Sequence, residues 1–120
     1  MFFLRCTSLV KIEIPPSVTE ILRDTFYHCN QLKEITIPKL VTKIGGHAFQ
    51  ECVSLSKVVI LSTSLQTICE CAFAYCPLLS DFSIPSSVTS IEKNPFIRCQ
   101  LITKFTLPPG LTSIEESVFS

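Results

Sequence analysis

The stretch from Phe26 to Pro38 reads FYHCNQLKEITIP, and related stretches recur at regular intervals along the chain. Each copy opens a longer unit, F-x-x-C-x-x-L-x-x-I-x-I-P-x-x-V-x-x-I-x-x-x-x-F, which repeats every 23 residues with one interval of 24. The first Phe of the unit occupies Phe3, Phe26, Phe49, Phe73, Phe96 and Phe119. A unit of this length is too short to bury its own apolar face, so neighbouring copies must stack on a shared core.

The unit contains two extended pieces and one turn. L-x-x-I-x-I alternates apolar and polar positions and is rich in β-branched residues, which predicts one short strand per repeat. The Pro that follows has no N–H to donate and ends that strand. A second extended piece, V-T-x-I, occurs at Val18–Ile21, and apolar residues three apart around Phe and Cys predict a single helical or 3₁₀ turn. Stacked in parallel, these units form a right-handed solenoid with a continuous sheet along one side.

The fold class predicted from the repeat is therefore a solenoid of about five 23-residue repeats in one domain, residues 1–120. One repeat departs from the pattern, because Leu61 replaces the expected Pro and an extra residue precedes Leu65. Solenoids place such insertions in surface loops, so residues 61–64 are expected to bulge from the turn.

Composition and charge exclude several classes of protein. Ten basic and ten acidic residues balance to zero net charge, which leaves no electrostatic footprint for nucleic acid. No uninterrupted apolar run approaches the about 20 residues of a membrane-spanning helix, which predicts no membrane insertion, and the polar residues from Arg5 onward leave no secretory signal. Three Gly residues are too few to suggest a phosphate-binding loop.

At these motifs the chain resembles the BspA-like leucine-rich repeat family. The match is close at Phe26–Pro38, at Ile44–Phe49 and at Ile84–Ile91, and it covers essentially the whole chain. The resemblance implies a curved solenoid, a leucine-rich repeat superhelix whose L-x-x-I-x-I strands form a parallel β-sheet on the concave face. It also implies a role in adhesion or protein binding, because the family includes large surface proteins of bacteria and parasitic protists. It supplies no catalytic residues.

The cysteines are expected to be structural. Five of the seven share one column of the repeat, which predicts a reduced ladder buried in the core better than it predicts disulfide pairs; they are Cys6, Cys29, Cys52, Cys76 and Cys99. The other two, Cys69 and Cys71, lie close to Cys76, and Cys71 shares a column with His47. Four convergent ligands at a defined spacing are needed for zinc, so we expect no metal and no cofactor.

Neither histidine is placed for catalysis. No Ser, Cys or Asp is spaced from His28 or His47 as in a recognisable triad, and His28 is expected to be solvated. We therefore expect no enzyme activity and identify no catalytic residue.

The candidate ligand-binding residues are the outward side chains of the main strands. One column alternates in charge, and the second runs beside it: Lys11, Glu34, Lys57, Asp81 and Lys104, then Glu13, Thr36, Val59, Ser83 and Thr106. In a parallel stack with rungs about 4.8 Å apart, each Lys has an acidic neighbour, so the column favours one register. Register control alone, and register control combined with ligand binding, both remain open.

The sequence thus predicts a non-catalytic protein-binding or cell-surface adhesion module, with an intracellular protein-interaction scaffold as the alternative. The partner is expected to be a protein of unknown identity, with neither nucleic acid nor membrane insertion involved. The family resemblance favours the cell surface, whereas the missing signal and the unpaired cysteines favour the cytoplasm. Because no polar cap is visible at either end, we also expect a piece of a longer array, or end-to-end self-association or a homodimer.

Overall fold

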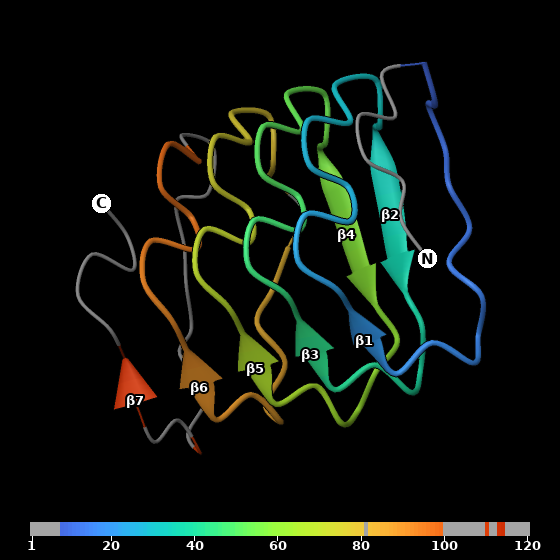
Figure 1. Cartoon of the computed structure of the whole chain (residues 1–120). Coiled ribbons are helices and arrows are strands. Elements are labelled where there is room, and N and C mark those ends of the chain that lie inside the picture. The colour runs from blue at the N-terminus through green and yellow to red at the C-terminus, as the bar shows by residue number, and fades with distance from the viewer. Residues whose placement is uncertain (1–7, 81, 100–109, 111–112, 115–120) are drawn as a thin grey trace.

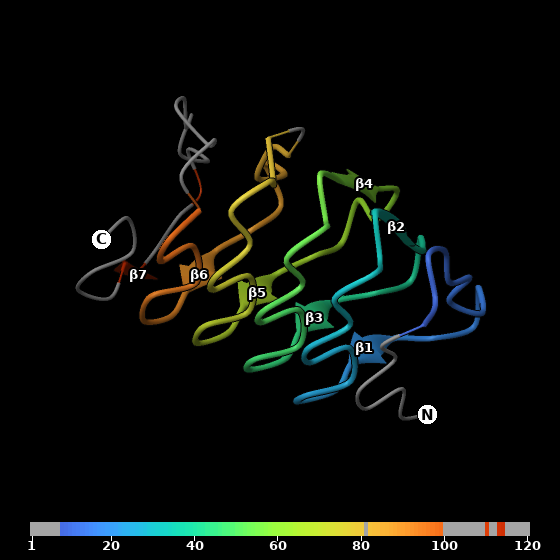
Figure 2. The same cartoon turned by 90° about the horizontal axis from the view of Figure 1, so that it is seen from above.

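The computed structural model is a stack of similar rungs, each formed by one copy of the repeat (Figure 1). It describes residues 8–80, 82–99 and 110, and the backbone of residues 113 and 114. The first rung carries Lys11 to Ile21, and each later rung follows in chain order. Seen from above, successive rungs lie side by side along the stack (Figure 2). No helix in the described part of the chain is long and apolar enough to cross a membrane.

The sheet that joins most rungs is built from very short strands. It contains β1 (Glu20–Ile21), β3 (Lys43–Ile44), β5 (Thr67–Ile68), β6 (Ser90–Ile91) and β7 (Ser113–Ile114), in that order and all parallel. Each of these strands comes from the V-T-x-I part of the repeat, and its Ile pairs with the Ile of the next rung. The second extended piece of the unit therefore provides the continuous sheet.

The L-x-x-I-x-I strands form a smaller sheet than expected. β2 (Glu34–Ile37) and β4 (Lys57–Ile60) pair in parallel along four residues. The first rung joins β2 through a single bridge between Lys11 and Glu34, and residues 82–85 of the fourth rung are not in a strand. The expected continuous main sheet is thus reduced to two strands within the described residues. The observed alternation of exposed and buried residues in β2 is nevertheless the predicted one.

The turn around Phe and Cys is not a helical turn. Between residues 24 and 29, the N–H groups of Thr25, Tyr27 and Cys29 each donate an i→i−3 hydrogen bond. The alternate N–H groups donate instead to the next rung, from Asp24 to Gly46, from Phe26 to Ala48 and from His28 to Gln50, at 2.8–3.0 Å. Half of the donors therefore leave the rung, so consecutive β-turns form where the sequence predicted a helical or 3₁₀ turn.

Left-handed residues make this alternation possible. Each described turn has two residues with φ between 53° and 63°, four positions apart: Asp24 and His28, His47 and Glu51, Cys71 and Tyr75, and Asn94 and Arg98. A positive φ is required at the third residue of a type II turn and is disfavoured in a helix. Asp, Asn and His tolerate this region better than most residues do. The backbone between them consequently cannot continue as a helix.

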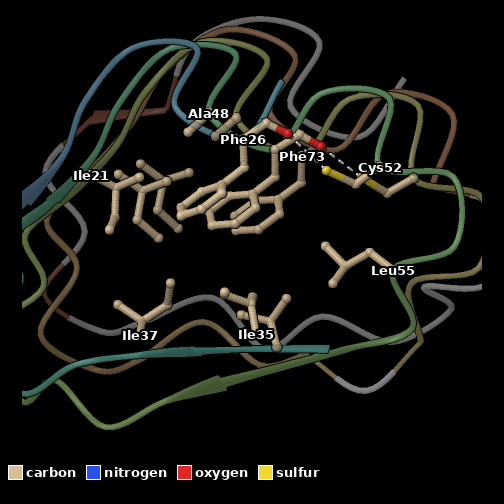
Figure 3. Close-up of a cluster of buried hydrophobic side chains, with 14 of the residues drawn as sticks. Ile21, Phe26, Ile35, Ile37, Ala48, Cys52, Leu55 and Phe73 are labelled. Carbon is tan, nitrogen blue, oxygen red and sulfur yellow. Dashed lines mark hydrogen bonds between the residues drawn. The ribbon is translucent and has the colours of Figure 1, made fainter. Parts of the chain in front are cut away.

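A stack of phenylalanine rings runs through the core. Phe26 and Phe49 lie with ring centroids 5.1 Å apart, as do Phe49 and Phe73, and Phe73 and Phe96 follow at 5.7 Å. The interplanar angles are 15° or less, and at most 4% of any of the four side chains is exposed. These rings form an aromatic spine (Figure 3), with the rings between the Ile21 side and the β2 side of the core.

The cysteine ladder lies beside this spine. The thiol of Cys52 donates to the Phe26 carbonyl at 3.2 Å, and the thiols of Cys76 and Cys99 make the same bond one and two rungs later. Cys29 is buried as well, so the predicted inward position of the ladder is confirmed for these four cysteines, none of which forms a disulfide within the described residues. Cys6 lies outside the described residues.

Candidate functional site

The charged column has the register that the sequence predicts. Lys11 is bridged to Glu34, and Glu34 is the partner of Lys57 in the β2–β4 pairing. The Lys11 Nζ lies 4.0 Å from the Glu34 Oε1, with side chains 72% and 49% exposed. An ion pair in such a position contributes less than about 1 kcal/mol, so its main effect is on register. Asp81 and Lys104 lie outside the described residues.

The second column lies beside the first and is also outward. Thr36 pairs with Val59, and Glu13, Thr36 and Ser83 are exposed. Val59 is half-buried, so it offers less surface than the other three. Thr106 lies outside the described residues. Among the described residues, the predicted site residues of the first rung, β2 and β4 therefore lie on one outward face, and Ser83 is exposed on the fourth rung.

A groove of about 690 Å³ opens between the first rung and β2. Its lining includes four of the predicted residues, Lys11, Glu13, Glu34 and Thr36. It opens because the two rungs pair at only one bridge, whereas β2 and β4 pair along the full length of both strands. In Figure 1 the chain of the first rung runs apart from β2 beyond this point.

Apolar side chains line the opposite end of the groove. Leu40 is 56% exposed and Leu61 is 49% exposed, and they lie in the lining with Pro16, Pro38 and Lys39. None of these was a candidate from the sequence. A signal was available in the sequence, because Leu40 is the one large apolar residue in its column of the repeat, whose other members are Ser17, Ser64, Ser87 and Gly110. Leu61, likewise, replaces the Pro that the repeat has at this position.

The insertion in the third rung supports this end of the groove. Ser62 is buried, and its hydroxyl donates to the Val41 carbonyl at 2.6 Å and accepts from the Ser64 N–H. The Leu61 N–H donates to the Ile37 carbonyl at 2.9 Å. The expected bulge is therefore confirmed for residues 61, 63 and 64, which are exposed. The buried Ser62 side chain anchors the loop to the second rung by a hydrogen bond, and Leu61 lies beside β2.

The remaining candidates do not assemble into a reactive centre. Cys69 is buried and Cys71 is half-buried, and no group of three or more His, Cys, Asp or Glu among the described residues could hold a metal. Burial raises the pKa of both thiols, with a further increase from Glu92 at Cys69 and from Glu70 at Cys71. These thiols are correspondingly less reactive than a free Cys.

The two histidines contact side chains at the rim of the stack. The His28 side chain is 45% exposed, as expected of a solvated residue, and its Nδ1 also lies 3.0 Å from the Oε2 of Glu51 on the next rung. The Nδ1 of His47 bonds to the Oε1 of Gln50 within its own turn. The stacking of rungs brings His28 and Glu51 together, because both occupy the same column of the repeat.

A match to the family model "BspA type Leucine rich repeat region" extends along residues 1–120, with six copies of the repeat. The chain belongs to this family. A leucine-rich repeat protein from Bacteroides ovatus ATCC 8483 has 31% identity and a TM-score of 0.85, with 94% of this chain and 29% of that one covered. This BspA-type chain is also similar to the Treponema pallidum leucine-rich repeat protein, at 27% identity, a TM-score of 0.87 and coverage of 92% and 53%.

A third solved structure is a leucine-rich cell surface protein from Faecalibacterium prausnitzii A2-165. It has 35% identity and a TM-score of 0.76 and is covered over 28% of its length, against 96% of this chain. The BspA-type chain thus spans between about a quarter and a half of these relatives. No curated protein matches the sequence. The parallel strands and the similar structures together establish the leucine-rich repeat solenoid.

Proposed function

We propose that the chain is a non-catalytic protein-binding module. Its binding surface is the outward face of the first rung, β2 and β4, together with the groove beside β2. The observation that carries the proposal is the groove, an open hollow with charged residues at one end and exposed leucines at the other. Binding sites are commonly concave and combine apolar lining with a few polar groups, and solenoid sheets present extended surfaces to protein partners.

The protein is proposed to act at the cell surface as an adhesion component. Support comes from the Faecalibacterium prausnitzii relative, which is described as a leucine-rich cell surface protein. An intracellular interaction scaffold is the alternative, and it is supported by the lack of a disulfide among the six described cysteines. Labelling intact source cells with a reagent that does not cross membranes separates the two, because only a surface protein is labelled before lysis.

The binding face is tested by exchanging the charges of one rung-to-rung pair. The double variant Glu34→Lys/Lys57→Glu reverses two exposed residues of the proposed face. Glu20→Lys/Lys43→Glu is the matched control, because Glu20 and Lys43 are the corresponding exposed partners on β1 and β3. Partners are captured from host or source-cell extracts, identified, purified and titrated against the three proteins.

The proposed face requires that the first double variant lose affinity for the purified partner while the control keeps it. Equal affinities would place the binding surface elsewhere on the solenoid. Circular dichroism of all three proteins shows whether any loss comes from unfolding.

A further inference from the structure

We propose that the groove beside β2 binds an extended peptide segment in which a basic and a large apolar side chain are separated by one residue. This inference rests on the proposed function and names the partner's chemistry at one part of that surface. It follows from three features of the groove: the backbone that borders it, the charge at one end and the leucines at the other.

The backbone at the groove has the form of two strands that part. The N–H of Lys33 donates to the Val10 carbonyl, and the bridge between Lys11 and Glu34 follows. The next backbone hydrogen bond between these two rungs, among the described residues, joins Thr42 to Thr19. Between these points the groove runs alongside β2. An extended peptide suits this shape, because it presents alternate side chains to one face about 6.6 Å apart.

The charge at one end of the groove favours a basic side chain. Lys11 and Glu34 neutralise each other across the bridge. Glu13 is exposed, lines the groove and has no ion-pair partner among the described residues. A Lys or Arg of the peptide placed beside Glu13 gains an opposite charge without displacing an existing pair.

The other end of the groove favours an apolar side chain and rejects a second cation. Leu40 and Leu61 are about half exposed there and gain free energy from further burial. Lys39 lies in the same lining and, among the described residues, has no ion-pair partner either. Its charge repels a basic residue at this end, so the basic side chain is directed toward Glu13.

The test uses blocked five-residue peptides with Thr as the β-forming spacer. The probe Thr-Lys-Thr-Leu-Thr carries both proposed side chains, while Thr-Glu-Thr-Leu-Thr and Thr-Lys-Thr-Ser-Thr each lack one. Binding is followed by the amide chemical shifts of the labelled full chain, which report affinity and location together. We expect saturable shifts at Glu13, Thr36, Leu40 and Leu61 with the probe, and weaker binding of both control peptides.

Matched variants assign the two ends of the groove. Glu13→Gln should weaken binding of the probe about two- to fivefold, as for one exposed ion pair. Leu61→Ser should weaken it about three- to tenfold through lost apolar burial. Glu20→Gln and Leu78→Ser are the controls, since Glu20 is exposed and Leu78 is 49% exposed, like Leu61, but neither lines the groove. Both should leave the affinity unchanged.

Several results would overturn the proposal. These are the absence of saturable shifts with the probe, equal binding of the acidic peptide, or an equal effect of Leu61→Ser and Leu78→Ser. Sedimentation in which the chain dimerises and only Leu61→Ser abolishes the dimer would make a second copy the occupant instead. A partner protein that binds wild type and Leu61→Ser equally, but not the Glu34/Lys57 double variant, would overturn the groove proposal while leaving the protein-binding function intact.

Discussion

Replacing Phe49 by alanine removes the middle of the aromatic stack. Phe49 is fully buried, and its ring lies 5.1 Å from both Phe26 and Phe73. Of the three stacked ring pairs among the described residues, the substitution therefore breaks two, and it leaves a cavity between rungs. Phe49→Ala should therefore weaken the coupling between neighbouring repeats.

The expected loss follows from burial and stacking. Replacement of a buried Phe by Ala costs about 3–5 kcal/mol, and each aromatic pair contributes about 0.5–1.5 kcal/mol beyond its buried area. With two stacked partners, Phe49 belongs at the upper end of this range, which is a large part of the 5–15 kcal/mol typical of a domain. Since rungs contact only their neighbours, the cavity should also uncouple the two sides of the stack.

Urea unfolding followed by circular dichroism measures both effects. We expect Phe49→Ala to lower the midpoint strongly and to broaden the transition, because the rungs before and after the cavity no longer unfold together. Phe49→Leu, which retains most of the apolar volume, should lose much less. A shift of the midpoint equivalent to under about 1 kcal/mol for Phe49→Ala would refute the role of the spine in stability.

Three further predictions concern close packing and the thiols. Gly45→Ala should cost about 1–3 kcal/mol, because its Cβ would lie 2.7 Å from the backbone of the preceding rung, whereas Gly110→Ala, with open space, should change the unfolding midpoint little. In the native protein a thiol reagent should modify half-buried Cys71 well before buried Cys76, because burial raises the pKa of the Cys76 thiol well above its usual value. Equal modification rates of the two cysteines, measured by mass spectrometry, would contradict the packing. Burial also raises the pKa of Cys99 to about 11. Because the thiol ionises at lower pH in the unfolded chain, the free energy of unfolding should fall between about pH 9 and pH 11. In urea titrations across this pH range, Cys99→Ala should show a smaller decrease in the free energy of unfolding than the wild type.

Much of the core could be predicted because the repeat determines which side chains share a column. Once copies stack in register, Phe49 must lie beside Phe26, and Cys52 beside Cys29, whatever the details of the turns. The same logic predicted the Lys11–Glu34–Lys57 order on the outward face. The contact between His28 and Glu51 could also have been predicted, because the two residues occupy the same column in consecutive copies of the repeat.

The candidate site could be predicted only in part. Period-two alternation identified Glu13, Glu34 and Thr36 as outward, since successive side chains of a strand point to opposite faces. The groove depends on how far the first rung parts from β2, and residues distant in sequence, such as Leu61, complete its lining. A pattern of apolar and polar positions carries no information on the distance between two rungs.

What the sequence by itself determined is the repeat, its stacking and the identity of the core columns, because a 23-residue period leaves one register in which the repeated Phe and Ile positions share the inward side. Only the tertiary structure decided how each turn is closed. Apolar residues three apart suit a helical turn, yet stacking offers carbonyls on the next rung, and the Phe26 N–H reaches Ala48 while the Cys29 N–H stays within its own turn. The positive φ angles of residues such as Asp24 and His28 allow alternate N–H groups to point toward the next rung. Hydrogen bonds between rungs outweigh the local preference for a helical turn, because a buried backbone N–H must find a partner.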